Sequence, residues 1–438
     1  MRHCALKITR MSFVAALLAI FAIAITARAT IAQTVVSQTA SADDTARFLA
    51  GMQPSATSPL VPMSQDQAAR QHATYFDTAF DNLEKDRLSK IRAWSAANLN
   101  APKAVTFYMF GGPDFLYADA FFPNATTYVL SGLEPVGQIP DLMKLPRGSV
   151  MQSLRNIQGS LRSVLTVSYF ITVDMFRDLN GGPVNGTLPI LYVFLARSGK
   201  VVHDVSLVHL DEQGALQPGD GTRPWSPVRG VKIVFSAKDG PQKTLYYFSG
   251  NLADNRNGNG ALLKFCKSLG QGDSFIKSAS YLLHTPEFSQ TRNFILDNSA
   301  TILQDDTGVP LAYFDAAKWQ LKIFGRYVTP IFPVYFQPKL NEFYQRAQPA
   351  SIEFGVGYRW RPNESNLLLA IKSVEAVEVT GSIPQEAVPR QQEPAPPQQQ
   401  KPAQVYRARP SQRVQNEGLP PPFPFFPFFL LGQPPGPQ

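Results

Sequence analysis

Cysteine is nearly absent from this sequence. Among 438 residues there are only two cysteines, Cys4 and Cys266. A framework of several disulfides is therefore excluded, because each bridge needs two cysteines. Cys266 ends the apolar segment Ala261-Leu262-Leu263-Lys264-Phe265, so we expect a buried thiol on a helix rather than a nucleophile.

Histidine is also scarce, with five residues. His203 and His209 are six apart on a candidate strand and would face the same side. They would lie about 20 Å apart, which is too far to share one metal. No serine occupies a G-x-S-x-G turn of the kind that presents a hydrolase nucleophile. The histidines therefore indicate no metal site, and the sequence shows no complete catalytic motif.

The apolar run near the N-terminus, Phe13 to Ile25, is about 13 residues long, whereas spanning a bilayer takes about 20. It follows the bases Arg2, Lys7 and Arg10, with no acid among them, and precedes Ala27-Arg28-Ala29. A basic start, an apolar middle and a small-x-small end predict a secretory signal peptide over residues 1–32, cleaved after Ala29 or Ala32. An uncleaved anchor is the alternative. We expect an exported protein, periplasmic or extracellular, with no transmembrane segment in the mature chain.

Cleavage changes what the composition implies. Cys4 leaves with the signal, so no internal disulfide can form in the mature chain. The formal net charge is +8, of which the signal carries +4 and the segment after residue 380 carries +2. A body at +2 has no electrostatic footprint for nucleic acid.

Composition divides the rest of the chain into four parts. Residues 33–63 are polar and predict a flexible linker, and residues 64–100 have apolar side chains at helical spacing and predict a helical arm. Residues 101–375 predict an α/β domain. Residues 381–438 are rich in Pro and Gln and predict a disordered tail. The tail ends in the aromatic cluster Phe423 to Leu431, which either docks on an envelope or protein partner or folds back onto the body.

Strand and helix patterns alternate through the α/β domain. We expect strands over 105–110, 127–130, 189–195, 201–210, 231–236, 244–248, 301–304, 311–314, 320–328 and 352–360. We expect helices over 115–122, 149–178, 262–269, 288–298 and 337–347, and either a strand or a helix over 275–283. Alternation of this kind predicts a mixed, mostly parallel sheet between two helical layers.

The segment from Phe107 to Pro135 resembles the nucleotide-binding turn of Rossmann-like enzymes, including methyltransferases. A strand runs into Gly111-Gly112-Pro113 and then into a helix, whose first N–H groups can hold an anion. Gly111 and Gly112 are therefore candidate cofactor-binding residues. The G-x-G-x-x-G pattern is absent, so a degenerate Rossmann-like three-layer scaffold is the alternative to a working site. The cofactor, if any, is not identified.

Four carboxylates follow candidate strands: Asp114, Glu134, Asp305 and Asp306. In open α/β sheets ligands bind at the carboxyl ends of strands, so these residues are candidate catalytic groups acting as acid and base or on a metal. Other readings stay open, because Asp114 can cap a helix and Asp305-Asp306-Thr307-Gly308 is also an ordinary turn.

The run Phe110-Gly111-Gly112-Pro113-Asp114-Phe115-Leu116-Tyr117-Ala118, with Gly132-Leu133-Glu134-Pro135 and Ile302-Leu303-Gln304-Asp305-Asp306, resembles a family of exported bacterial proteins with no assigned activity. The resemblance covers roughly residues 64–350. It implies that this region is one unit, and it implies no catalytic residue.

Three functions remain open. The first is a non-catalytic binding or envelope-associated α/β protein, and the second is a carboxylate-dependent hydrolase with a cleft at the strand ends. The third is a degenerate fold that binds a nucleotide or S-adenosylmethionine.

Overall fold

The computed structural model describes residues 39–373, except 172–174, 176, 178, 180–181, 220–227, 255 and 257. The chain divides into a unit of Met1–Val377 and a second unit of Glu378–Gln438. The second unit, the predicted signal peptide and the predicted tail lie outside the described residues. Among the described helices, none has both the length and the apolar character needed to cross a membrane.

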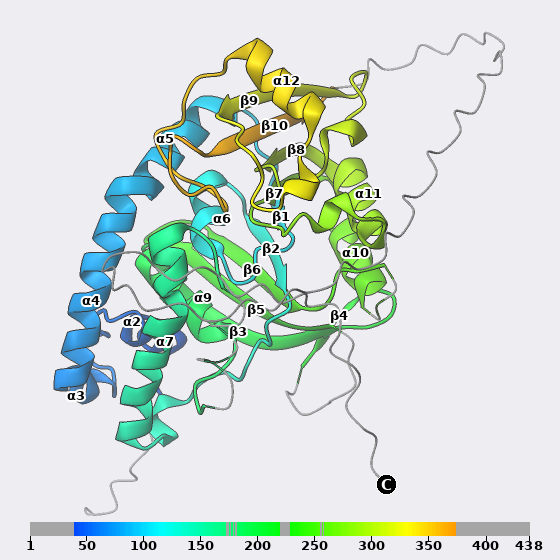
Figure 1. Ribbon diagram of the computed structural model, residues 1–438. Coiled ribbons are helices and arrows are strands. Elements are labelled where there is room, and N and C mark those ends of the chain that lie inside the picture. Colours follow the sequence, from blue (N-terminus) through cyan, green and yellow to red (C-terminus); the bar gives the residue numbers. More distant parts are fainter. Residues whose placement is uncertain are drawn as a thin grey trace, which may run out of the picture. The chain divides into compact units, whose positions relative to one another are not determined.

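One mixed sheet runs through the first unit (Figure 1). Its strands are β1 (Val105–Tyr108), β2 (Thr127–Gly132), β3 (Lys200–Leu210), β4 (Leu216–Pro218), β5 (Val228–Ala237), β6 (Gln242–Ser249), β7 (Gly272–Ile276), β8 (Ser299–Gln304), β9 (Trp319–Gly325) and β10 (Asn366–Lys372). Their order is β4-β3-β5-β6-β2-β1-β7-β8-β10-β9.

The centre of the sheet is parallel and both ends are antiparallel. β6, β2, β1, β7 and β8 run in one direction. β5, β3 and β4 extend one end in antiparallel fashion, and β10 and β9 extend the other. The predicted mixed α/β sheet is confirmed, but four neighbouring pairs are parallel and five antiparallel, so the parallel share is smaller than expected.

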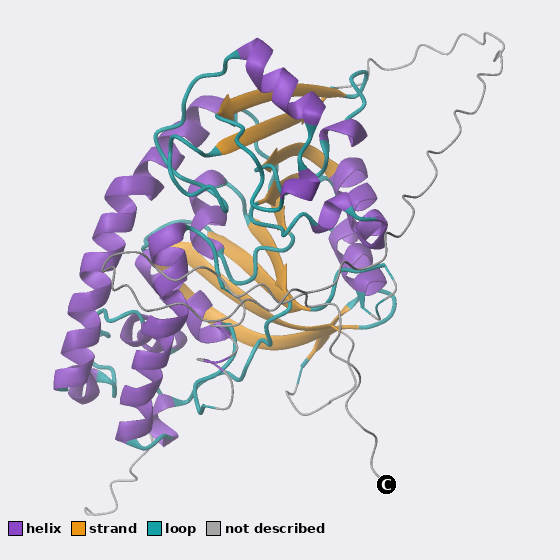
Figure 2. Ribbon diagram, in the orientation of Figure 1, coloured by secondary structure: helices purple, strands orange, loops and turns teal. Residues whose placement is uncertain are grey.

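Helices cover both faces of the sheet (Figure 2). They are α2 (Ala42–Leu49), α3 (Val61–Ser64), α4 (Gln67–Leu83), α5 (Ser89–Asn98), α6 (Phe115–Phe121), α7 (Arg147–Val167), α9 (Leu188–Arg197), α10 (Asn259–Ser268), α11 (Ser289–Asn298) and α12 (Pro338–Ala347). The π-helical turn η1 (Glu84–Leu88) joins α4 to α5. The 3₁₀ turns are η2 (Leu142–Lys144), η3 (Leu282–His284), η4 (Pro286–Phe288), η5 (Leu311–Tyr313) and η6 (Pro333–Tyr335).

Alternate residues of the central strands enter two separate cores. Tyr108 and Leu130 pack with buried side chains of α2, α4, α6, α7 and α9. Their neighbours Phe107 and Val129 pack with those of α10, α11 and α12. Successive strand side chains point to opposite faces, so this alternation produces the predicted three-layer arrangement.

The chain winds outward in two directions from β1 and β7. From β1 it passes through α6 to β2, and from β7 it passes through α11 to β8. α6 and α11 belong to opposite cores, and β1 pairs with β7 through Thr106 and Asp273. In open α/β sheets the ligand crevice lies beyond the carboxyl ends of the strands at such a switch point. The residues that follow β1 and β7 are therefore where this fold would place a ligand site.

Several predicted elements differ in the structure. Residues 189–195 were expected as a strand but lie in α9, whose side chains are buried all round, so an apolar run without a period did not separate helix from strand. Residues 311–314 lie largely in the 3₁₀ turn η5, and 352–360 form a loop with one isolated bridge. The last strand is β10, which the sequence analysis did not include.

The predicted flexible linker over 33–63 is wrong for its described part, 39–63. Ser41 caps α2, accepting a hydrogen bond from the Asp44 N–H at 3.0 Å. Phe48 and Leu49 are buried, and α2 packs against α9 and β3. Because small polar residues are frequent in this segment, the sequence analysis did not recognise the short amphipathic helix α2. The predicted helical arm over 64–100 is confirmed as α4, η1 and α5, and it packs on the core.

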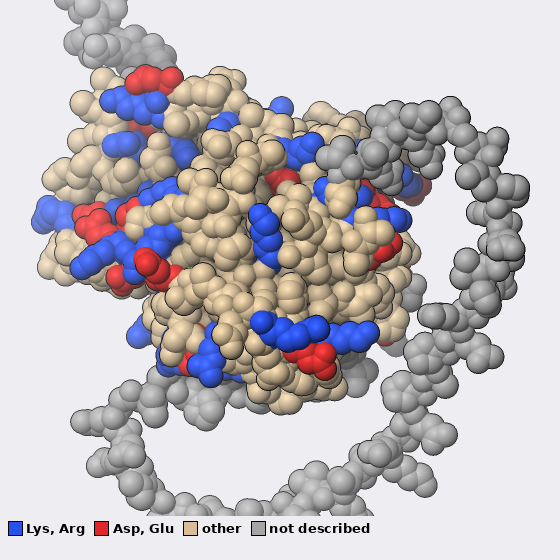
Figure 3. All heavy atoms as spheres, turned by 90° about the horizontal axis from the view of Figure 1, so that it is seen from above, with Lys and Arg blue, Asp and Glu red and all other residues tan. Residues whose placement is uncertain are grey.

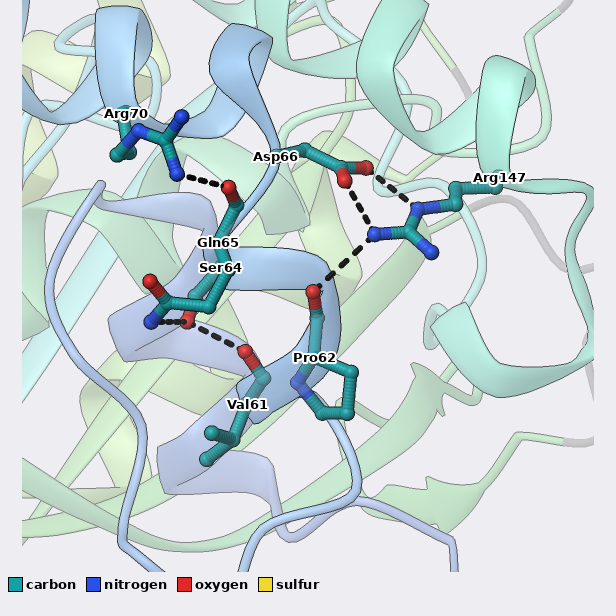
Figure 4. A network of polar contacts seen from close by, with 7 residues as sticks. All are labelled: Val61, Pro62, Ser64, Gln65, Asp66, Arg70 and Arg147. Atoms are coloured by element: carbon teal, nitrogen blue, oxygen red, sulfur yellow. Dashed lines mark hydrogen bonds and ion pairs between the residues drawn. The ribbon is translucent and has the colours of Figure 1, made fainter.

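A polar network at the start of α7 fastens the α3–α4 turn to the body (Figure 4). The Arg147 Nε donates to Asp66 Oδ2 at 2.5 Å, and its Nη2 donates to the Pro62 carbonyl at 3.1 Å. The Arg147 guanidinium lowers the pKa of Asp66. Arg70 donates to the Gln65 carbonyl within the same turn. The N-terminal helices are thus held by specific contacts.

Candidate functional site

The carboxyl ends of β2, β1, β7 and β8 lie along one edge of the sheet. Glu134 follows β2, Asp114 follows β1, and Asp305 and Asp306 follow β8, so each of them follows a strand as expected. Lys277 follows β7 and was not predicted. All five side chains are buried. Ionisable side chains are rarely buried unless they are paired. The partners of these five side chains therefore determine which of them are available for chemistry at this edge of the sheet.

Asp114 and Lys277 form an ion pair at the switch point. The Lys277 Nζ lies 2.8 Å from Asp114 Oδ2, and the two side chains are 2% and 1% exposed. The Tyr108 hydroxyl donates to the same oxygen at 2.9 Å. Asp114 Oδ1 accepts from the Tyr117 N–H at 3.4 Å, so Asp114 also caps α6. Both carboxylate oxygens therefore have partners within the chain.

Lys277 is held on three sides. Besides Asp114, its Nζ donates to the Ser168 carbonyl and lies 3.9 Å from the ring centroid of Tyr117. Burial lowers the pKa of Lys277, while the charges of Asp114 and Asp305 act in the opposite direction. A lysine directly after the apolar residues Phe275 and Ile276 was a usable signal. Nothing local indicated its partner, which lies far away in sequence.

Asp305 faces the same cluster. Its Oδ1 accepts from the Thr307 N–H at 3.0 Å and from the Thr307 hydroxyl, and its Oδ2 accepts from the Ser278 N–H at 2.9 Å. Burial, and then the charge of Asp306, raise the pKa of Asp305 to about 6. Asp305 also acts electrostatically on Lys277 and Tyr108. We call Tyr108, Asp114, Lys277 and Asp305 the charge cluster.

Asp306 has different partners. Its Oδ2 accepts from the Tyr281 hydroxyl at 2.7 Å, and its Oδ1 accepts from the Asn366 amide at 3.2 Å. Burial raises the pKa of Asp306. The two adjacent carboxylates therefore do not share a hydrogen-bond donor among these contacts. The Asp305-Asp306-Thr307-Gly308 turn also serves a structural purpose, because the Gly308 N–H donates to the Asp305 carbonyl.

Glu134 lies beside the glycine turn after β1. A Cβ on Gly132 would lie 2.5 Å from Glu134 Oε2, and a Cβ on Gly112 would lie 3.4 Å from it. The Glu134 backbone carbonyl accepts from the Tyr247 hydroxyl at 2.7 Å. The structure thus brings Asp114 and Asp305 together around Lys277 and places Glu134 against the Gly112 backbone.

Internal packing explains the two glycines singled out as cofactor-binding candidates. A Cβ on Gly111 would lie 2.4 Å from the Tyr108 ring. Gly112 has a φ of +59°, and its N–H donates to the Ser131 carbonyl at 2.9 Å. The Tyr117 N–H in the first turn of α6, where a phosphate would bind, is already used by Asp114. The chain's own side chains therefore occupy the positions that a nucleotide would need.

Backbone strain is concentrated around the charge cluster. Seven described residues other than glycine have positive φ, and five of them lie here. Phe110 follows β1, Ser278, Ser280 and Tyr281 follow β7, and Ser168 accepts from Lys277. Each such residue costs of order 1–3 kcal/mol, and strained residues gather at functional sites. The stretch after Lys277 is therefore the most constrained part of the edge.

A loop formed by residues 352–365, which we call the covering loop, lies over the cluster. Its Gly357 carbonyl accepts from the Ser168 hydroxyl at 3.0 Å, and the Tyr358 and Ser280 hydroxyls are 2.8 Å apart. Gly357 has a φ of +70°, and a Cβ there would lie 2.0 Å from Asp305 Oδ2. Only glycine allows the loop to approach Asp305 this closely.

Other candidate groups have structural partners. Cys266 is buried, and burial raises the pKa of its thiol. His203 shares a 2.8 Å hydrogen bond with Ser236, and burial lowers the pKa of His284 to about 4. Within the described ranges, no three or more His, Cys, Asp or Glu side chains are grouped so as to hold a metal ion.

Comparison of the chain with protein-family models, with curated proteins and with solved structures found no match.

Proposed function

We propose that this protein is an exported, non-catalytic binding or envelope-associated protein. In this proposal the side chains of the charge cluster fill the switch point of a Rossmann-like sheet, where a ligand would otherwise bind. The observation that carries the proposal is the buried Asp114–Lys277 pair. It fills the place where related architectures hold a ligand, and each charge neutralises the other. Removing one partner of a buried pair is costly because the other charge is left uncompensated.

The proposal is tested by separating the stabilising role of the pair from catalysis. Lys277→Met should lower the free energy of unfolding by about 3–5 kcal/mol, and adding Asp114→Leu should restore much of that loss. Lys144→Met is the matched control, because Lys144 pairs with Asp141 at 2.9 Å with its own side chain largely exposed. That control should change stability by less than about 1 kcal/mol.

Wild type and a further variant, Asp114→Asn, are assayed with ester, phosphate and glycoside substrates. The proposal expects wild type and Asp114→Asn to give the same background rate. Turnover by wild type that disappears in Asp114→Asn would overturn it, provided that circular dichroism shows the variant to be folded.

A carboxylate-dependent hydrolase is the second candidate, and Asp305 favours it. A carboxyl group with its pKa raised to about 6, close to a lysine and a tyrosine and beside strained backbone, resembles a general acid–base arrangement. This candidate expects activity that depends on ionisation near pH 6 and is lost in Asp305→Asn. The nucleotide alternative has less support, because Tyr108 and Asp114 occupy the glycine turn and the start of α6.

A further inference from the structure

An apolar turn stands out on the surface near α12. Val334 is 84% exposed and Phe336 is 41% exposed, both in or next to η6. Tyr313 is 46% exposed in η5, which is joined to this turn by a hydrogen bond from the Leu311 N–H to Gln337 Oε1 at 2.9 Å. Large apolar side chains are seldom left this exposed in a group without a purpose. We call Tyr313, Val334 and Phe336 the apolar patch.

The turn that carries Val334 and Phe336 is anchored by ring contacts with Tyr281 and Tyr327. Tyr335 stacks on the buried ring of Tyr281, with centroids 4.9 Å apart and planes 10° apart. Phe332 packs on the same ring at 5.8 Å. Phe336 stacks on Tyr327 at 5.8 Å, and the Gln337 N–H donates to the Tyr327 hydroxyl at 3.0 Å. Phe332, Tyr335 and Phe336 therefore anchor the turn, while Val334 remains exposed.

Bases outnumber acids in the segment that carries the patch. Residues 313–346 contain five bases, Lys318, Lys322, Arg326, Lys339 and Arg346, and two acids, Asp315 and Glu342. Arg326 precedes Tyr327, and Lys339 is the second residue of α12, three residues after Phe336; both are exposed. Within the described residues neither forms an ion pair with an acid. Figure 3 looks down on the molecule from above, where Lys and Arg, with Asp and Glu among them, are spread over a largely uncharged surface.

We propose that the apolar patch, with Arg326 and Lys339, binds the surface of an anionic phospholipid bilayer. Aromatic rings with a polar edge settle at the level of the lipid headgroups, an exposed aliphatic tip enters the acyl boundary, and bases beside it attract anionic lipid. The excess of bases over acids in residues 313–346 complements such a surface. Three exposed side chains on a turn are few for a protein interface, which needs about 20–30 residues a side.

This inference rests on the envelope-associated part of the proposed function, since it names the component to which the protein would bind. It is tested by flotation of the full chain with vesicles of phosphatidylethanolamine and phosphatidylglycerol, and with phosphatidylcholine vesicles. The ends of the chain contain apolar runs of their own, so every variant keeps both ends unchanged.

Wild type should float with the anionic vesicles and much less with phosphatidylcholine. Val334→Asp should reduce binding at least about tenfold, because burial of one aliphatic side chain is lost and a charge must be desolvated. Lys339→Glu should also weaken binding, and so should raised salt, since screening shortens electrostatic reach. Leu133→Asp, at a residue 56% exposed after β2, is the matched control and should bind within about twofold of wild type.

Equal binding by wild type and Val334→Asp would overturn the inference, and so would equal losses in Val334→Asp and Leu133→Asp. Failure of wild type to float with anionic vesicles would overturn it as well, even if the protein were found to bind a protein partner. None of these results bears on the assays for turnover, so the surface and the proposed function can fail separately. Thermal unfolding of each variant confirms that the exposed substitutions leave the fold intact.

Discussion

At the scale of single residues, the carboxyl edge of the sheet depends on how each charge is compensated. Asp114 and Lys277 are compensated by each other, and Asp306 by hydrogen bonds from Tyr281 and Asn366. Asp305 has three donors, but burial and then the neighbouring charge of Asp306 raise its pKa. The protonation of Asp305 therefore differs between the folded and the unfolded chain.

Stability should reflect that protonation. The folded protein binds a proton on Asp305 up to about pH 6, whereas the unfolded chain releases it near the ordinary value of 3.8. Asp305 therefore lowers the free energy of unfolding as pH rises from about 4 to about 6. His72 and His284, with pKa values lowered to about 4, act in the opposite direction over the same range.

The measurement is thus a difference between two stability curves. Urea unfolding of wild type and of Asp305→Asn is followed from pH 4 to 7, and stability of the variant relative to wild type should increase with pH. Asp239→Asn, in the exposed hairpin turn at a φ of +61°, is the control for loss of a surface carboxylate. A difference for Asp305→Asn that does not change with pH would contradict the raised pKa.

At the scale of elements, the covering loop completes the site. It contributes Gly357 next to Asp305 and Tyr358 next to Ser280, and it lies between α12 and β10 in the sequence. The pattern over 352–360 favoured a strand, but the residues form a loop that follows the edge. A β-like composition was outweighed by contacts with Ser168 and Asp305, which are distant in sequence.

The close approach of the covering loop should make Gly357 intolerant of a side chain. Gly357→Ala should destabilise the protein by more than about 2 kcal/mol, since it combines an unfavourable φ with a Cβ contact on Asp305. Gly270→Ala is the matched control, because Gly270 has a φ of +82° but nothing within 4 Å of a Cβ. Chemical denaturation of both variants should show a larger loss for Gly357→Ala; equal losses would mean that the contact with Asp305 contributes nothing.

At the scale of the whole molecule, the N-terminal helices belong to the same folded unit as the sheet. α2 packs on α9 and β3, and the Asp43 carboxylate accepts from the Val202 N–H at 3.0 Å. α4 packs on α7, and Arg147 binds Asp66. The body therefore extends to residue 39 at least.

Truncating Phe48 tests this extension. Phe48 is 3% exposed, so Phe48→Ala should cost about 3–5 kcal/mol in the free energy of unfolding. Thr57→Ala, on an exposed residue of the same segment, should change stability by less than about 0.5 kcal/mol. Thermal and denaturant unfolding of the two variants provide the comparison. A negligible effect of Phe48→Ala would mean that the segment is a loosely attached linker after all.

Local pattern alone predicted the elements with a clear period. The strands β5 and β6, the helices α4, α10 and α12, and the alternation of strands and helices were all readable from the sequence. The sequence also placed Asp114, Glu134, Asp305 and Asp306 after strands, but it did not show that these strand ends share one edge of the sheet. α9 was misread because an apolar segment that is buried on all sides has no period.

The pairing of the charges was decided only by the tertiary structure. Lys277 lies 163 residues from Asp114 along the chain, and Gly357 lies 52 residues from Asp305. Sequence patterns report how a residue relates to its neighbours within a turn or a strand, but a buried charge is stabilised by whatever the fold brings to it. The compartment, the fold class and the candidate carboxylates therefore came from the sequence as expectations. Their assignment to a charge cluster, a capping contact or a glycine turn required the packed structure.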